Sequence, residues 1–274
     1  MLYIFLSILC SVIIGNMLLY FSKNDKNDIL LIFLGNYFFA AIFSFVQIKP
    51  GTLSFGTFEI VFGFITGFFF LYNFFVYQKN IALNGLSLSV GIMRVSVLIP
   101  TFMSVIFFDD FMSVVNLMGI LVIVLAFWLI TETSTLQKLI WIILLFFVSG
   151  ATDSTLKIYN ELGQPDQSPF VFILFSSAFI CTLIWVVKTK RAFSLSCILF
   201  GFLLGIPNQL STRFFLMGLE TVPAPIAYPL TASSIVVFSI FSDIIFWRRM
   251  FTIKQRIALA LLVAGIVLIN AQNG

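Results

Sequence analysis

The stretch GFITGFFFLYN, residues 63–73, is followed about 138 residues later by the similar stretch GFLLGIPNQ, residues 201–209. Both copies place two glycines four residues apart, a step that lets two membrane helices approach each other closely. Glycine is common in membrane helices, so one such step has little weight, but its recurrence predicts a chain of two related units. Helix-packing roles are therefore expected for Gly63, Gly67, Gly201 and Gly205. The same role is expected for Gly15 and Gly150, which align with each other in another pair of similar segments.

The composition places this chain in a membrane. Hydrophobic residues make up 61% of its 274 residues and charged residues only 9%, more apolar surface than one soluble core can bury. The three cysteines lie in apolar runs without CxxC spacing, and the chain has no histidine. These absences argue against a disulfide framework, a metal site and the nucleophile pairs that use histidine, so neither a cofactor nor an enzyme is expected.

Polar interruptions divide the chain into ten apolar segments, each near the 20 residues that a membrane helix needs. We therefore predict an all-α integral membrane protein of ten transmembrane helices. The expected spans are 2–21, 29–48, 57–78, 85–108, 112–131, 138–158, 170–187, 195–217, 224–247 and 254–271. The first span lacks a basic leader and a cleavage site, so we expect a retained helix and not a signal peptide.

Lysines and arginines are distributed unevenly between the two sets of connections. The odd-numbered connections and the residues beside them hold eleven, whereas the even-numbered ones hold only Lys49 and Lys157. Because short cytoplasmic loops are enriched in these residues, we expect the odd connections in the cytoplasm and both termini outside, with Asp109 and Asp110 also outside.

Three further pairs of segments support the repeat at similar offsets. Each unit would contain five helices, an odd number, so the second unit must enter the membrane inverted relative to the first. We expect two inverted five-helix repeats, residues 1–135 and 136–274. The paired segments are SVIIGNMLLYFSK (11–23) with FVSGATDSTLKIY (147–159), ALNGLSLSVGI (82–92) with GLETVPAPIAY (218–228), and FFDDFMSVVN (107–116) with FWRRMFTIKQ (246–255).

These features together resemble a known family. A glycine late in the first helix, the ALNGLSLS turn before a helix with a mid-span proline, Pro-Thr-Phe at 100–102 and a charged pair before the next span are similar to the EamA family of the drug/metabolite transporter superfamily, as a bacterial ten-helix member. The resemblance is strongest over residues 201–246. It implies a secondary transporter with a central cavity. Many members keep both termini in the cytoplasm, against the charge distribution here, and Asp109-Asp110 and Arg248-Arg249 replace the family's usual glycine-glutamate pair.

Arg94 is the most informative single residue. It lies about ten residues into a helix of two dozen, near the bilayer midplane, where a charge is costly unless it faces protein or water. It either pairs with an internal carboxylate, of which Asp153 is the leading candidate, or lines a cavity and binds an anionic group of a substrate. An Asp153–Lys157 pair is the alternative, and a cavity-facing Asp153 would be a candidate proton site for coupling. Snorkelling suits the charges nearer to helix ends, namely Glu59, Lys157, Arg213 and Asp243.

Uncharged polar residues and prolines gather in the same expected helices. A proline inside a span frees a backbone carbonyl, and such discontinuities often mark the binding sites and bending points of transporters. Each polar residue alone suits an interhelical hydrogen bond better, but as a group they are candidates for substrate binding. The substrate candidates are Asn16, Tyr72, Asn73, Asn208, Gln209 and Tyr228 with Arg94, and the hinge candidates are Pro100, Pro207 and Pro229.

We therefore expect a multi-pass transporter of the bacterial inner membrane, working as a monomer or homodimer in the lipid bilayer. Its substrate would be a small polar metabolite, amino-acid-like first, with sugar-like or drug-like solutes as rivals. A channel and an intramembrane enzyme are the less favoured alternatives. The enzyme is disfavoured because the general acid and base inventory is poor, whereas a channel stays an open alternative, which would show unsaturable flux. The basic residues do not cluster on one polar segment, so no nucleic-acid partner is expected.

Overall fold

The structure is a computed structural model, which describes residues 1–24, 27–48, 56–96, 98–107, 113–133, 136–164, 168–219 and 224–269. The described chain is helical throughout. Its helices are α1 (Leu2–Ser22), α2 (Ile29–Val46), α3 (Thr57–Asn84), α4 (Leu86–Val95), α5 (Leu98–Phe107), α6 (Val114–Thr133), α7 (Leu136–Leu162), α8 (Ser168–Lys188), α9 (Leu195–Leu219), α10 (Ala224–Ile245) and α11 (Ile253–Ile269).

The helices agree closely with the expected spans. Residues 86–107, which contain α4 and α5, form one apolar span, so the eleven helices of the described chain make the ten predicted spans. Six of these spans are long and apolar enough by themselves to cross a bilayer, and α6, α9 and α10 contain shorter apolar stretches. Many large apolar side chains are exposed, among them Phe68, Leu121 and Phe241, as expected of surfaces that face lipid.

The fourth span is broken where the sequence predicts a discontinuity. Pro100 has no N–H for the carbonyl of Ser96, four residues earlier, and its ring excludes a regular helix there. The carbonyl of Ser96 instead accepts a hydrogen bond from the amide of Ile99, at 3.0 Å. The chain therefore ends α4 at Val95 and begins α5 at Leu98, which places Pro100 in a first turn where its missing N–H costs little.

One expected interruption is wrong. The polar run at residues 78–80 was expected to end a helix, but α3 continues to Asn84. Asn80 is buried, and its side-chain oxygen accepts hydrogen bonds from Asn84 at 3.1 Å and from Ser89 at 3.0 Å. The helix ends at Gly85, whose φ of +88° is a conformation that other residues rarely adopt. Because these polar side chains are buried and bond one another between helices, the run at residues 78–80 continues the helix and does not form the predicted loop.

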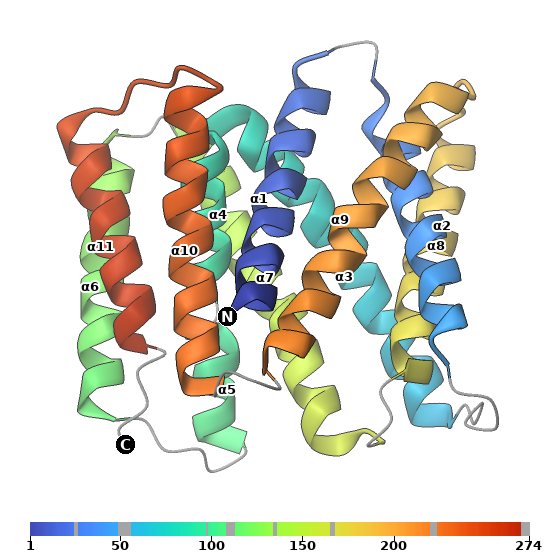
Figure 1. Ribbon diagram of the computed structural model, residues 1–274, viewed down its shortest axis with the longest axis horizontal. Helices are drawn as coiled ribbons and strands as arrows, with labels where there is room; N and C mark the ends of the chain where they lie inside the picture. Colours follow the sequence, from blue (N-terminus) through green and yellow to red (C-terminus); the bar gives the residue numbers. More distant parts are fainter. Residues whose placement is uncertain are drawn as a thin grey trace.

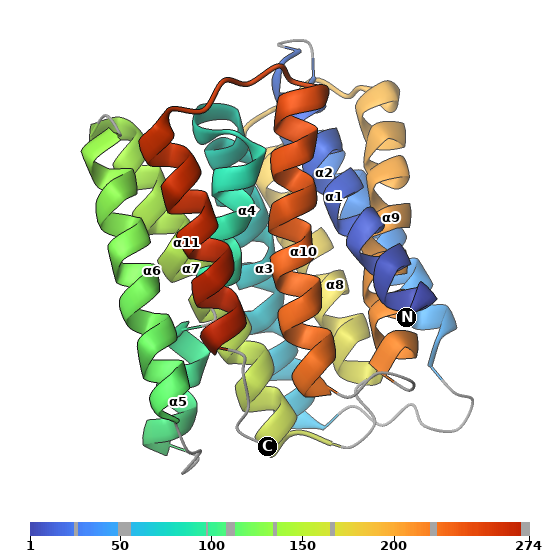
Figure 2. The same ribbon diagram turned by 60° about the vertical axis from the view of Figure 1, so that its left-hand side comes forward.

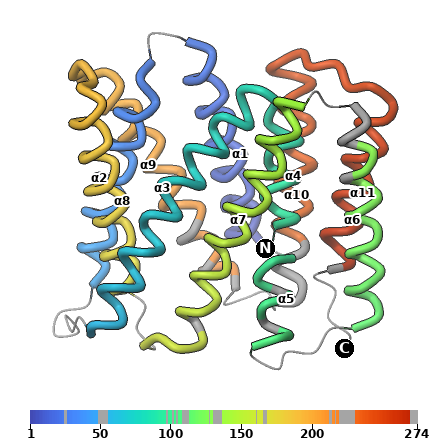
Figure 3. The backbone as a smooth tube through the Cα atoms, turned by 180° about the vertical axis from the view of Figure 1, so that it is seen from behind, coloured from blue at the N-terminus to red at the C-terminus, as the bar shows by residue number. Residues whose placement is uncertain are grey.

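The helices pack as a row of pairs when the molecule is viewed as in Figure 1. α6 packs on α11 at one end, and α2 packs on α8 and α9 at the other. Between them lie α1, α4, α7 and α10, with α3 crossing behind (Figures 1 and 3). Since α4 contacts α3, α7, α10 and α11, it is the short central element on which the middle of the bundle depends.

Four of the five connections that are rich in lysine and arginine lie at one end of the bundle. The links from α1 to α2, α3 to α4, α8 to α9 and α10 to α11 are together at the top of Figures 1 and 2, and α11 ends at the opposite side. The described basic residues beside these connections are Lys23, Lys79, Lys188, Lys190, Arg191, Arg248, Arg249, Lys254 and Arg256. Lys138, near the start of α7, lies at the same end, where its carbonyl accepts a hydrogen bond from Asn84 in the last turn of α3. This end is called the basic end below.

The paired glycines bring the outer helices together. A Cβ at Gly67 of α3 would meet the hydroxyl of Ser177 and the carbonyl of Leu174, both on α8. In the same way Gly201 of α9 lies against the backbone of α2, at Ile32 and Asn36. The glycine steps therefore hold α3 to α8 and α9 to α2, where even one methyl group would separate the backbones.

Candidate functional site

Arg94 lies in the last turn of α4. At 1.5 Å per residue it is about 12 Å along the helix from Leu86, which starts at the basic end, so the guanidinium is deep in the apolar layer. The carbonyl end of a helix has a partial negative charge, and a cation in the last turn is favoured there. The break at Ser96 therefore supplies part of the field that stabilises Arg94 inside the membrane.

The Arg94 side chain has no hydrogen bond to any residue that the structure describes, and its Nε atom is buried without a partner. Its nearest electrostatic neighbours are the carboxylate of Asp153 on α7 and the hydroxyl of Tyr77 on α3. Neither of them reaches it with an ion pair within 4.0 Å or a hydrogen bond. Arg94 and Asp153 are partly accessible, whereas Tyr77 is 4% exposed. The structure thus brings together a cation and an anion that the sequence proposed as partners, without direct contact.

The alternative pair within α7 is not observed. Lys157 lies 2.7 Å from Glu161, one turn further along the helix, and both side chains are partly exposed. Asp153 has no ion pair within 4.0 Å in the described part of the chain, and the cation that interacts with it electrostatically is Arg94.

Arg94, Asp153 and Tyr77 form what we call the central cluster. Contacts between α3, α5 and α7 form one side of it. The hydroxyl of Ser149 donates to the side-chain oxygen of Asn73 at 2.7 Å, which joins α7 to α3. One residue further, Gly150 packs against Ile99 just past the break between α4 and α5. Of the sequence candidates, Asn73 therefore lies on the α3–α7 interface, where its partner Ser149 is four residues, about one helical turn, before Asp153.

Asn16 is placed elsewhere. Its side-chain oxygen accepts hydrogen bonds from Ser242 of α10 and from the indole N–H of Trp247, at 2.5 Å and 2.8 Å, and its amide donates to the carbonyl of Val12. These bonds join α1 to the basic end of α10, and Lys23 stacks on Trp247 with its Nζ 4.0 Å from the ring centroid. The side-chain oxygen accepts two hydrogen bonds and the nitrogen donates one, which favours a structural role for Asn16.

Other sequence candidates are distributed over outer interfaces. Tyr72 stacks with Phe68, which is 51% exposed. Asn208 of α9 donates to the side-chain oxygen of Asn36 on α2, at 3.2 Å, while the buried Gln209 has an amide nitrogen without a partner in the described chain. The side chains of Tyr228, Pro229 and Arg213 lie outside the described residues, as do residues 108–112 with Asp109 and Asp110.

The predicted discontinuities at the other two prolines are not seen as helix breaks. α9 is a continuous helix from Leu195 to Leu219 with Pro207 inside it, and α10 is continuous across position 229. Neighbouring helices in a membrane protein can satisfy the carbonyl that a proline frees, so a span can tolerate the residue. Pro207 itself is buried.

A second charged cluster, which we call the clasp, was missed from the sequence. Asp243 of α10 was expected to snorkel but is 1% exposed, and its Oδ2 accepts hydrogen bonds from the amide and the hydroxyl of Ser87, at 2.9 Å and 2.6 Å. Ser87 is in the first turn of α4, so Asp243 caps α4 from another helix. Proximity along the sequence offers no sign of this contact, since it joins residues 156 positions apart.

Arg249 completes the clasp. Its guanidinium lies against Gly85, where any Cβ would overlap it, and it interacts electrostatically with Asp243. Partial burial lowers the pKa of Arg249, and the Asp243 carboxylate opposes that shift. Glu59 was also expected to snorkel, yet it is 4% exposed in the first turn of α3, where the helix dipole favours a carboxylate. Both carboxylates thus lie at the N-terminus of a helix, and for Asp243 the amide of Ser87 is a direct partner.

The described residues contain no group of three His, Cys, Asp or Glu side chains that could hold a metal ion. The fold and the central cluster define a multi-pass membrane protein with a charged site inside its bundle.

Comparison with protein families agrees with this class. Residues 136–271 match the EamA-like transporter family, and through them the chain belongs to that family, as the sequence features predicted. The protein is accordingly an integral membrane transporter of small solutes and not an enzyme. A search of curated proteins returned no match.

Solved structures confirm the fold. One, titled only "Crystal structure of protein", has a TM-score of 0.67 over 98% of this chain and 95% of its own, at 14% sequence identity. At this level of identity the likeness shows the shared architecture.

Proposed function

We propose that the protein is a secondary transporter that moves a small polar metabolite with an anionic group by alternating access. The observation that supports this most is Arg94, a partly exposed residue deep in the bundle whose guanidinium has a buried Nε and no hydrogen bond in the described chain. A charged donor left without a partner in an apolar interior costs several kcal/mol. A carboxylate held by the guanidinium in two parallel hydrogen bonds would remove that cost while the ligand is bound.

The central site would lie between two inverted five-helix repeats, residues 1–135 and 136–274. The helix contacts support this division, because they come in pairs that the repeat would exchange. α1 packs on α9 as α3 packs on α7, α2 packs on α9 as α3 packs on α8, and α1 packs on α10 as α4 and α5 pack on α7. Three further contacts, α2 with α8, α4 with α10 and α6 with α11, each join a helix to its own counterpart. Rocking of one repeat against the other would expose the site alternately to each side.

An amino-acid-like substrate suits the two opposite charges best. Its carboxylate would bind Arg94, and its ammonium group would lie toward Asp153, whose carboxylate shares the same electrostatic environment. Tyr77 and Asn73 offer polar atoms near these groups. A sugar-like or drug-like solute without a carboxylate would not satisfy the guanidinium, and it ranks below an amino-acid-like one for that reason.

Transport would be driven by the substrate gradient, by exchange or by protons, since the sequence has no nucleotide-binding motif. We assign Asp153 as the candidate coupling residue. The groups that face it are Arg94 from α4 and, through Arg94, Tyr77 from α3. Protonation of Asp153 would leave Arg94 as an uncompensated cation and so strengthen its attraction for an anionic ligand. Pro100, beside the break in the fourth span, is the best placed of the three hinge candidates.

We propose further that the basic end faces the cytoplasm of a bacterial cell and that both termini lie outside, as the distribution of lysine and arginine favours. The chain would work in the inner membrane as a monomer or homodimer. A reporter that is active only in the cytoplasm, fused in turn to each terminus, tests the orientation. Activity at both termini would reverse it and leave the transport proposal unaffected.

Ligand-induced thermal stabilisation of the purified protein tests the central proposal. A panel of amino acids, organic acids, sugars and amines is measured with the parent, Arg94→Gln, Arg94→Lys and the control Lys188→Gln, which removes an exposed charge at the basic end. We expect a zwitterionic or anionic compound to stabilise the parent and the control, to stabilise Arg94→Lys weakly, and to have no effect on Arg94→Gln.

The proposal fails if the stabilising compounds are uncharged, or if the folded Arg94→Gln protein binds as tightly as the parent. Uptake of the same compound into proteoliposomes then distinguishes transport from binding. Saturation and counterflow would be seen for a transporter and not for a channel.

A further inference from the structure

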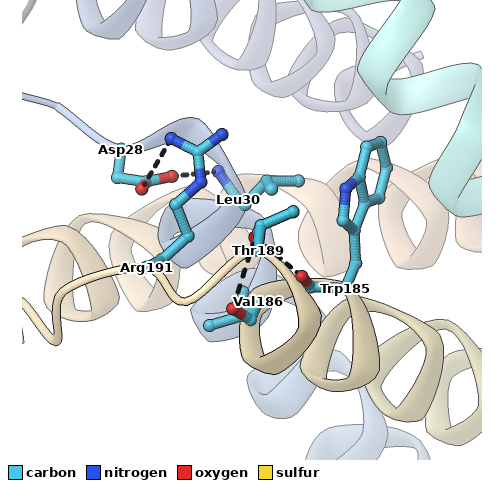
Figure 4. Close-up of polar contacts among 6 residues, drawn as sticks. All are labelled: Asp28, Leu30, Trp185, Val186, Thr189 and Arg191. Atoms are coloured by element: carbon cyan, nitrogen blue, oxygen red, sulfur yellow. Dashed lines mark hydrogen bonds and ion pairs between the residues drawn. The ribbon is translucent and has the colours of Figure 1, made fainter.

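A large polar basin lies at the basic end, away from the central site. Its volume is about 870 Å³, and its walls come from the α1–α2 connection, the last turns of α3 and α8, and the α8–α9 connection. Its lining includes Asp28, Gln78, Lys79, Trp185, Lys190 and Arg191. Figure 4 shows the wall formed by Asp28, Trp185, Thr189 and Arg191.

The basin is positively charged within the described part of the chain. Lys79, Lys190 and Arg191 line it against one carboxylate, that of Asp28. One oxygen of Asp28 already caps α2 by accepting from the amide of Leu30 at 3.0 Å, and the other lies 3.5 Å from Arg191 (Figure 4). Lys79 and Lys190 are exposed and form no ion pair with a described residue. Two cations are thus left to attract an anion, and Arg191 is held in place beside them.

Gln78 adds a second, independent feature. Its side chain is in the basin wall and only 4% exposed, yet its amide oxygen has no hydrogen-bond partner in the described chain. A buried acceptor without a donor is unfavourable, because it has lost its hydrogen bonds to water and gained none in the protein. A ligand that offers hydroxyl groups next to an anionic group would satisfy the amide and the lysines together.

The position of the basin indicates which ligands can reach it. It opens at the end of the membrane-spanning layer, where Trp185 packs on Phe75 and where tryptophan commonly marks the headgroup level. Phe193, at the rim, is 76% exposed. An anion at this level can come from a phospholipid headgroup or from a soluble phosphate ester.

We propose that this basin binds a phosphate ester with neighbouring hydroxyl groups, of which the phosphoglycerol headgroup of an anionic lipid is the first candidate. Lys79, Lys190 and Arg191 would contact the phosphate, and Gln78 would accept a hydrogen bond from a glycerol hydroxyl. Because the walls belong to connections from both halves of the chain, the ligand would bridge α1–α2 to α8–α9. The site is separate from Arg94, so it stands or falls independently of the proposed transport function.

Binding is measured on the full chain in detergent by thermal stabilisation and by native mass spectrometry. The added compounds are short-chain phosphatidylglycerol, phosphatidic acid, phosphatidylcholine and soluble glycerol 1-phosphate. The variants are Lys79→Gln/Lys190→Gln, Gln78→Met, and the matched control Lys138→Gln/Lys188→Gln, which removes two lysines from the same end outside the basin.

We expect saturable binding of phosphatidylglycerol, unchanged in the control and weakened about twenty-five-fold in Lys79→Gln/Lys190→Gln, from roughly a fivefold effect for each lysine. Gln78→Met should abolish the preference for phosphatidylglycerol over phosphatidic acid, which has no headgroup hydroxyl, without loss of phosphate binding. Equal binding of glycerol 1-phosphate would uphold the site and assign it to a soluble ligand. The proposal is overturned if neither phosphatidylglycerol nor glycerol 1-phosphate binds saturably, or if the control loses as much binding as Lys79→Gln/Lys190→Gln.

Discussion

The central cluster and the clasp both place charges in an apolar part of the same protein, and they treat them differently. Asp243 accepts two hydrogen bonds from the first turn of α4, and Arg249 lies near it. Arg94, at the other end of the same helix, has an electrostatic neighbour in Asp153 but no hydrogen bond in the described chain. One short helix therefore has at its start a charge that accepts direct hydrogen bonds through one oxygen, Oδ2 of Asp243, while Oδ1 has no partner in the described chain, and at its end a charge with no hydrogen bond to any described residue.

The number of direct partners indicates which charged group has a structural role and which is a candidate for ligand binding. A buried charge with several direct partners is destabilising to disturb, because its partners are left unpaired. A charge without direct partners is not stabilised by hydrogen bonds within the protein, so its removal should lower the free energy of unfolding only slightly. The effect of the substitution on ligand binding can then be measured separately. The two ends of α4 are thus expected to respond oppositely to mutation, in stability at the clasp and in substrate binding at Arg94.

The largest effect is expected for Asp243→Ala. The change leaves the amide and hydroxyl of Ser87 without an acceptor and Arg249 without its nearest carboxylate, so we expect a loss of about 3 kcal/mol in the free energy of unfolding. Thermal unfolding of the purified protein measures it, with Asp243→Asn as the comparison that retains an acceptor oxygen. If Asp243→Ala unfolds at the temperature of the parent, the clasp does not hold α4.

Arg94→Met should give the opposite result. We expect its thermal stability to equal or exceed that of the parent, since an unpartnered guanidinium is replaced by an apolar side chain of similar length. Apparent substrate affinity should fall by about 2 kcal/mol, roughly thirtyfold, for loss of a charge-assisted contact. A variant that is much less stable before any ligand is added would place Arg94 with the clasp as a structural residue.

Asp153→Asn sharpens the comparison through pH. If Asp153 takes up the coupling proton, uptake by the parent changes several-fold between pH 5.5 and 8, and uptake by the variant stays flat over that range. Counterflow, which needs no net proton movement, should persist in the variant. Identical pH profiles of uptake for the two proteins would remove Asp153 from the coupling step.

The smallest effect is expected for Ser149→Ala. It removes the hydrogen bond from Ser149 to Asn73 between α7 and α3, and such bonds inside membranes contribute about 0.6 kcal/mol each. We expect a fall of a few degrees or less in the unfolding temperature, with substrate affinity kept within about threefold. A loss of binding as large as that in Arg94→Met would move Ser149 and Asn73 into the substrate site.

Much of the fold followed from the sequence, because the bilayer permits few solutions. Apolar length predicted ten spans, and Pro100 predicted the break in the fourth, since each depends on a local property of the chain. The stop expected at residues 78–80 failed where Asn80, Asn84 and Ser89 satisfy one another between helices. Pro207 did not break α9, because the consequence of a proline inside a span depends on what packs around it.

The roles of the candidate site residues stay predictions, but the proximity of two of them could be expected from the sequence. Arg94 and Asp153 could be named because a charge in a long apolar run is visible in the sequence, and the structure places them as electrostatic neighbours. Asn16 and Asn208 could not be assigned in advance, because an amide in a helix serves a ligand or another helix equally well. Their partners, Ser242 with Trp247 and Asn36, are all distant in sequence.

The sequence by itself determined the class of protein, the number of spans, the basic end and the intramembrane charge at Arg94, since composition, helix length and charge placement are properties of the chain alone. Only the tertiary structure decided which charges are satisfied. Asp243 reaches Ser87 across 156 residues, Lys157 turns to Glu161, and Arg94 is left with no direct partner in the described chain. Pairing depends on distances between helices that pack far apart in sequence, and those distances decide whether a buried charge stabilises the fold or is free to bind a substrate.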